Sequence, residues 1–111
     1  MDAKTLWEKL IKKARVSEFE THTVPQNNNT PLWFQVGVQG SYLVISKARS
    51  KTPSVNLSRD RKINFKDFEL VHSYYERWKN GETGIRYEVS RKSRNTAYIF
   101  ALIDHASKTF V

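Results

Sequence analysis

Apolar side chains recur with helical spacing in three parts of the chain, and a residue suited to capping a helix precedes each part. Asp2 precedes the first helix, which is predicted over about residues 3–14. Asn64 precedes the second, over about residues 65–80, and Asn80-Gly81 ends it. The run from Ser93 to Thr96 offers caps for a third helix over about residues 96–106. The predicted buried faces are Leu6, Trp7, Leu10, Ile11 and Ala14; then Phe65, Phe68, Val71, His72, Tyr75 and Trp78; and finally Ala97, Tyr98, Ala101, Leu102 and His105 or a neighbouring stripe.

Segments typical of β-strands lie between these helices. Residues 32–38 and 42–49 flank the turn Gln39-Gly40-Ser41, which predicts a hairpin whose second strand is interior because both of its faces are apolar. Further strands are predicted at residues 19–24, 54–57, 62–63 and 85–89, the last from the alternation of Ile85, Tyr87 and Val89. Hairpin connections favour antiparallel pairing. We therefore expect an α+β fold with a mainly antiparallel sheet of about 4–5 strands and N-terminal, central and C-terminal helices.

Length and composition narrow the class of protein. A chain of 111 residues is near the commonest domain size, so we expect a single domain over residues 1–111. A hydrophobic content of 39% is too high for a disordered chain. The chain has no cysteine, no apolar run of the roughly 20 residues that span a bilayer, and no apolar signal-peptide core after Met1. These features predict a cytoplasmic protein without membrane contact.

Positive charge is the strongest functional signal. The formal net charge is +8 and the isoelectric point is near 9.9. Residues 47–66 alone hold seven basic residues against the single acid Asp60, and a second basic group follows at residues 86–94. Such concentrated charge attracts polyanions. In nucleic-acid recognition, contacts to phosphates supply affinity, and Arg contacts to base edges discriminate between the bases. The residues predicted to bind nucleic acid are Lys47, Arg49, Lys51, Arg59, Arg61, Lys62, Lys66, Arg91, Lys92 and Arg94.

Other polar and aromatic side chains would complete such a surface. Neutral hydrogen bonds to the nucleic-acid backbone are expected from Asn56, Ser58, Ser93, Asn95 and Thr96. Exposed rings would stack on unpaired bases, and Trp33 and Tyr42 are the leading candidates among the aromatic residues outside the predicted core. We therefore predict a non-catalytic nucleic-acid-binding domain, for which DNA is a slightly better candidate ligand than RNA.

Two other interpretations stay open. The basic stretch is also consistent with a solvated surface rim whose only effect is to increase solubility. Alternatively, Trp33 and its neighbours form an apolar patch in a protein-interaction or small-ligand module, as a monomer or a homodimer, with the basic rim facing an acidic protein partner.

Signals for catalysis, metals and cofactors are absent from the sequence. His22, His72 and His105 lack the short paired spacing of a zinc site, and no thiolate accompanies them. Asp104-His105 has no serine in a glycine elbow to complete a triad, and the chain has no P-loop or G-x-G-x-x-G. Gly84-Ile85-Arg86-Tyr87 and Tyr98-Ile99 do not meet the spacing of GIY-YIG nucleases. We expect no cofactor, no metal and no enzymatic activity.

Three stretches carry a resemblance to known families, and together they cover about residues 31–106. They are Pro31-Leu32-Trp33-Phe34, Ile63-Asn64-Phe65-Lys66-Asp67-Phe68 and Asn95-Thr96-Ala97-Tyr98-Ile99. The chain resembles small mobile-gene-cassette proteins of the integron type, which share a genomic setting without sharing a fold. It is also similar to accessory DNA-recognition modules of restriction endonucleases, which implies DNA contact but transfers no catalytic residue.

Overall fold

The computed structural model describes residues 1–25 and 29–110. The elements in chain order are α1 (Ala3–Val16), β1 (Phe19–His22), β2 (Trp33–Gln39), β3 (Tyr42–Lys47), β4 (Arg61–Ile63), α2 (Phe65–Lys79), α3 (Ile85–Ser90) and α4 (Thr96–Thr109). This arrangement confirms the predicted α+β fold with N-terminal, central and C-terminal helices.

The two predicted N-caps stabilise the starts of α1 and α2. The Asp2 carboxylate accepts a hydrogen bond from the Thr5 N–H at 2.8 Å. The Asn64 side-chain oxygen accepts one from the Asp67 N–H at 2.8 Å, and Asp67 places an acid in the first turn, where the helix dipole favours it. Local chemistry therefore sets where these helices begin.

The four strands form one antiparallel sheet in the order β1-β2-β3-β4. Gly40, at φ 60°, makes the tight turn between β2 and β3, a backbone conformation that suits glycine. The strand β3 is interior, as predicted, and β4 is an edge strand. Within the described residues, the expected strand at 54–57 is reduced to a single bridge between Ser54 and Trp33.

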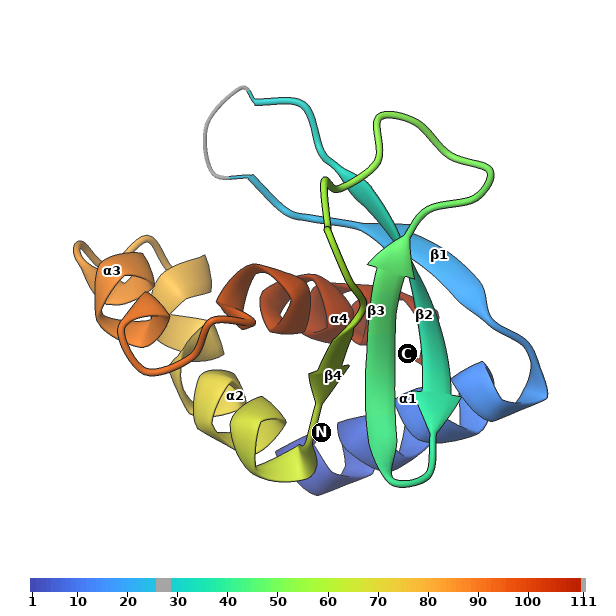
Figure 1. The fold of residues 1–111 in the computed structure, drawn as a ribbon. Coiled ribbons are helices and arrows are strands. Elements are labelled where there is room, and N and C mark those ends of the chain that lie inside the picture. The colour runs from blue at the N-terminus through green and yellow to red at the C-terminus, as the bar shows by residue number, and fades with distance from the viewer. Residues whose placement is uncertain (26–28, 111) are drawn as a thin grey trace.

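The helices α1 and α4 cover one face of this sheet, and Figure 1 shows both passing behind β2 and β3. Residues paired across neighbouring strands share a face, so Val36 and Ile45 point toward the helices while Gly37 and Val44 point away. We call the side that points away the outer face. The helix α4 is central because it contacts α1, α2, α3 and β1.

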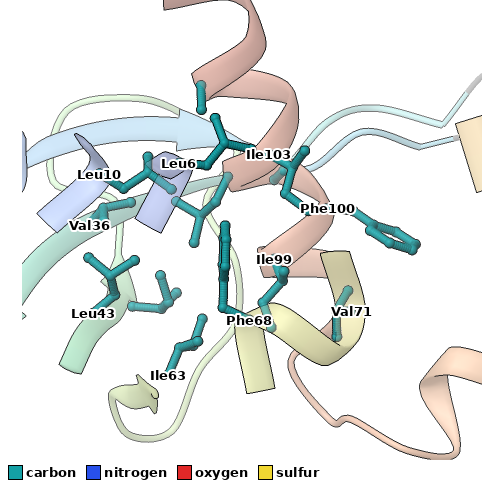
Figure 2. Packing of buried hydrophobic residues seen from close by; sticks show 14 of the residues in the cluster. Leu6, Leu10, Val36, Leu43, Ile63, Phe68, Val71, Ile99, Phe100 and Ile103 are labelled. Atoms are coloured by element: carbon teal, nitrogen blue, oxygen red, sulfur yellow. The ribbon is translucent and has the colours of Figure 1, made fainter. Parts of the chain in front are cut away.

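The core lies between the sheet and these helices. Phe68 of α2 lies among side chains of α1, α4 and the sheet in Figure 2, and its ring centroid is 5.2 Å from that of Trp7. In α4 the buried residues are Thr96, Ile99, Phe100, Ala101, Leu102, Ile103, Asp104 and Ala106, which is mainly the neighbouring stripe rather than the one through Tyr98 and His105.

The prediction of a strand at residues 85–89 is wrong, because Ile85–Ser90 is the short helix α3. Ile85 and Val89 are buried, whereas Tyr87 is 71% exposed. Positions 85 and 89 share a face in a strand and also, at i and i+4, in a helix. Burial against the neighbouring helices selected the helical arrangement.

Across the described parts of the chain, we find no helix long and apolar enough to cross a membrane.

Candidate nucleic-acid interface

A polar hollow of about 550 Å³ lies beside the edge strand β4. Three stretches of chain form it: the approach to β4, β4 itself, and the connection from α3 to α4. We call it the basic hollow, because four of its lining residues are cationic and one is acidic. The lining residues are Asn56, Leu57, Ser58, Arg59, Asp60, Arg61, Lys62, Arg94 and Asn95.

Arg61 joins the two distant parts of the basic hollow. It pairs with Ile45 across the sheet, so its side chain projects toward the helices. Its Nη1 donates to the backbone carbonyl of Arg94 at 2.7 Å, and its guanidinium carbon lies 5.5 Å from the centroid of the Tyr98 ring. A planar guanidinium can make both contacts at once. Arg61 therefore holds the start of α4 beside β4.

Lys62 reaches the same hollow from the opposite face of β4. It pairs with Val44, and its Nζ lies 5.9 Å from the ring centroid of Tyr42 on the outer face. An edge strand allows this, because side chains from both of its faces can bend around a strand that has no neighbour. The basic hollow thus continues onto the outer face of the sheet.

Buried hydrogen bonds fix the connection from α3 to α4. The Ser93 hydroxyl oxygen accepts from the Asn95 N–H at 3.1 Å, and the Thr96 hydroxyl donates to the Ser93 carbonyl at 2.8 Å. Ser93, Asn95 and Thr96 are all buried, and the hydroxyl groups of Ser93 and Thr96 are engaged in hydrogen bonds within the connection. Their role is to position Arg94.

Asn95 is the exception, because part of its amide stays unused. Its Nδ2 donates to the Asp67 carboxylate at 3.0 Å, while its Oδ1 is buried and has no hydrogen-bond partner among residues 1–25 and 29–110. It occupies the N-cap position of α4 without making a side-chain cap hydrogen bond. Asn95 therefore lines the basic hollow while its side-chain oxygen is enclosed by protein.

The cations of the basic hollow are not neutralised by ion pairs. Within the described part of the chain, the four ion pairs join Arg49, Arg77, Lys79 and Lys108 to acids. Arg59, Lys62 and Arg94 are exposed and take part in none of them. Asp60 lies in the same hollow, but the balance there is strongly positive.

Arg49 and Lys51 belong to a separate loop after β3. The Glu20 carboxylate accepts hydrogen bonds from the backbone N–H groups of Arg49, Ser50 and Lys51, each at 2.9 Å. Burial raises the pKa of Glu20, but these three hydrogen bonds outweigh it and hold the pKa below its ordinary value. Sequence reasoning missed Glu20, since nothing near it in the chain indicates a partner about thirty residues away.

The remaining predicted basic residues lie elsewhere. Lys92 donates to the Tyr74 hydroxyl at 2.6 Å, and the Arg91 guanidinium lies 5.8 Å from the Tyr87 ring centroid. These contacts direct both side chains toward α2 and α3. Lys66 is exposed in the first turn of α2, and Lys47 is exposed at the end of β3. The fold therefore gathers four of the ten predicted residues in the basic hollow.

The two aromatic candidates differ in accessibility. Tyr42 is 41% exposed on the outer face, beside Lys62. Trp33 is partly buried, with the His22 ring edge-on at 4.7 Å between centroids and the Lys51 Nζ at 5.6 Å from its ring centroid. Tyr42 is thus the more accessible ring, whereas Trp33 packs against His22 and Lys51.

The histidines form no cluster. Among the described residues, no group of three or more His, Asp or Glu side chains is arranged to hold a metal ion. Burial lowers the pKa of both His72 and His105, and the nearby Lys13 lowers that of His105 further. His72 stacks on Phe68 and His105 on Phe19, so both rings pack as boundary residues.

No family model matches this chain, and no curated protein or solved structure matches it either.

Proposed function

We propose that this protein binds nucleic acid through the basic hollow, without catalysing a reaction. The observation that carries the proposal is that Arg59, Lys62 and Arg94 are exposed, have no ion pair among the described residues and line one hollow, although Arg94 is distant in the chain from the other two. Exposed cations held close together favour phosphate groups, because releasing condensed counterions drives such binding. The bidentate geometry of two arginines suits phosphate oxygens.

The arrangement also supports contact with more than one phosphate. Lys62 extends the positive surface onto the outer face beside Tyr42, and Lys66 follows at the start of α2. A strand of nucleic acid crossing the edge of the sheet would meet these side chains in turn. Tyr42 offers a ring on which an unpaired base could stack.

The test is a salt-titrated binding assay with duplex DNA, single-stranded DNA, RNA and heparin. If four cations each neutralise one phosphate, log affinity for duplex DNA should fall with log salt at a slope of about −3.6. The triple variant Arg59→Gln, Lys62→Gln, Arg94→Gln should flatten that slope by roughly three units. Lys4→Gln, Lys9→Gln, Lys12→Gln on α1 is the matched control, because it removes the same charge from exposed positions.

Two outcomes would count against the proposal. Equal weakening by both triple variants would mean that overall charge, and not the basic hollow, attracts the ligand. Heparin binding as tightly as every nucleic acid would indicate attraction to polyanions in general.

A second candidate function, binding another protein, has its own surface. Val16, at the end of α1, is 82% exposed between two recesses of about 560 and 520 Å³ whose linings include Trp7 and Ile11 on one side and Phe19 and Phe110 on the other. Exposed apolar side chains beside such recesses are typical of protein contacts. Sedimentation over a range of concentrations tests self-association, and Val16→Asp should abolish any dimer that uses this surface.

A further inference from the structure

The outer face of the sheet is open over β3 and β4, beside the basic hollow. Figure 1 shows α1 and α4 behind the sheet and α2 and α3 to one side of it, so within the described part of the chain no helix covers this area. On the outer face, β3 presents Tyr42, Val44 and Ser46. Val44 and Ser46 are partly buried, whereas Tyr42 is 41% exposed. Tyr42 is therefore the ring that this area offers to a ligand.

Positive and negative side chains lie at opposite edges of the outer face. Lys62 projects from it at the β4 edge, where it also lines the basic hollow. Glu20 belongs to the same face at the β1 edge, and Glu18 reaches across to Gly37 of β2, where an added Cβ would lie 2.6 Å from its Oε2. Carboxylates repel phosphate groups, whereas Lys62 attracts them. A nucleic-acid strand on this face is therefore expected over β3 and β4, away from β1.

Tyr42 is close enough to the basic hollow for one ligand to contact both. The Lys62 Nζ lies 5.9 Å from the centroid of the Tyr42 ring. In a nucleotide a single sugar joins the phosphate to the base, so a phosphate held at Lys62 has a base that can reach Tyr42. Inside a duplex the faces of the bases are stacked on neighbouring pairs. Only an unpaired base can therefore stack on this ring.

We propose that the ligand is a single strand of nucleic acid that runs from the basic hollow onto the outer face. Its phosphates lie against Arg59, Lys62 and Arg94, and one unpaired base stacks on Tyr42. This inference rests on the proposed binding of nucleic acid and specifies its substrate class, because the cations alone do not distinguish a single strand from a duplex. Every base has a face that can stack, so the strand is bound with little preference for sequence.

The test uses ligands that share their phosphates and differ in their bases. Fluorescence-anisotropy titrations of the whole chain, at about 0.15 M salt, compare a single-stranded DNA, an abasic DNA strand of the same length, an RNA of the same sequence and a DNA duplex. We expect the single-stranded DNA to bind about tenfold more tightly than the abasic strand, a difference that one stacked base can supply. The tighter of the DNA and RNA strands identifies the source of the ligand.

Four variants assign this difference to Tyr42. Tyr42→Leu should lower the affinity for the single strand about tenfold and leave the abasic strand unchanged, whereas Tyr42→Phe keeps the ring and should keep the parent affinity. Tyr87→Leu is the matched control, because Tyr87 is 71% exposed beside Arg91 and lies outside the basic hollow. Arg94→Gln should weaken the single strand and the abasic strand by the same factor, since it removes a phosphate contact.

The outcomes distinguish this inference from the proposed function. Equal affinity for the single strand and the abasic strand would overturn the stacked base while binding through the basic hollow persists. The same conclusion would follow from a duplex that binds more tightly than both single strands, or from a duplex that loses as much affinity through Tyr42→Leu as the single strand does. Failure of every nucleic acid to bind would overturn both proposals.

Discussion

Arg61 donates a hydrogen bond from its guanidinium to the backbone carbonyl of Arg94 at 2.7 Å, although 33 residues separate the two positions. One basic residue thereby positions another. The contact fastens the connection that precedes α4 to the edge of the sheet. The position of Arg94 in the basic hollow therefore depends on Arg61.

Replacing Arg61 should therefore affect both stability and binding. For Arg61→Gln we expect a loss of about 1–2 kcal/mol in the free energy of unfolding, typical of losing one hydrogen bond from a charged donor. Arg61→Lys keeps the charge but lacks the planar fork, so it should lose most of the same stability. Urea denaturation measures this. Full stability in both variants would show that the contact with Arg94 contributes nothing.

The Glu20 carboxylate should control the order of the loop that carries Arg49 and Lys51. Glu20→Gln removes the negative charge that three backbone N–H groups share, and we expect amide hydrogen exchange at residues 49–51 to rise roughly tenfold. Because the pKa of Glu20 is lowered in the folded protein, the stabilisation is present above pH 4.5 and is lost as the pH falls through the folded value. Exchange at Val71, a fully buried position, is the internal control.

Stability should also decline in mildly acidic solution because of His105. Burial lowers its pKa from 6.5, so near that pH the unfolded chain takes up a proton that the folded protein does not. The free energy of unfolding is thus highest above pH 6.5 and falls as the pH drops from there toward the folded pKa. His105→Phe preserves the stacking on Phe19 and should reduce this decline, measured as melting temperatures from pH 8 to pH 5. His72 has a lowered pKa too, so part of the decline should persist.

Alanine substitutions at two glycines should differ in how much they change stability. Gly84 has φ 82°, and placing alanine there should cost about 1–2 kcal/mol because an L side chain is strained in that region. At Gly37 an added Cβ would lie 2.6 Å from Oε2 of Glu18, the end of a flexible and exposed side chain that can move away. Gly37→Ala should therefore stay within about 0.5 kcal/mol of the parent, since alanine also restricts the unfolded chain. Thermal denaturation of both variants decides this.

Local signals explain which elements were predictable. The caps at Asp2 and Asn64 and the turn at Gly40 act on residues within a few positions, so the sequence pattern predicted α1, α2 and the hairpin of β2 and β3. The segment 85–89 failed because its two buried positions fit either a strand or a helix. Its environment, rather than its own pattern, decided between them.

The candidate site was only partly predictable for the same reason. Clustering of charge in residues 59–62 is visible in the chain. Nothing in the chain indicates that Arg94 would join the first basic group while Arg91 and Lys92 would turn toward Tyr87 and Tyr74.

The amino-acid sequence by itself determined the fold class, the caps of α1 and α2, the hairpin and the excess of positive charge, because each depends on composition or on residues near one another in the chain. Only the tertiary structure decided that α3 is helical, that Asn95 is buried and bonded to Asp67, and that Arg94 lies beside Arg61. Those outcomes depend on how distant segments pack around α4, and packing brings together side chains whose separation along the chain carries no record of their contact.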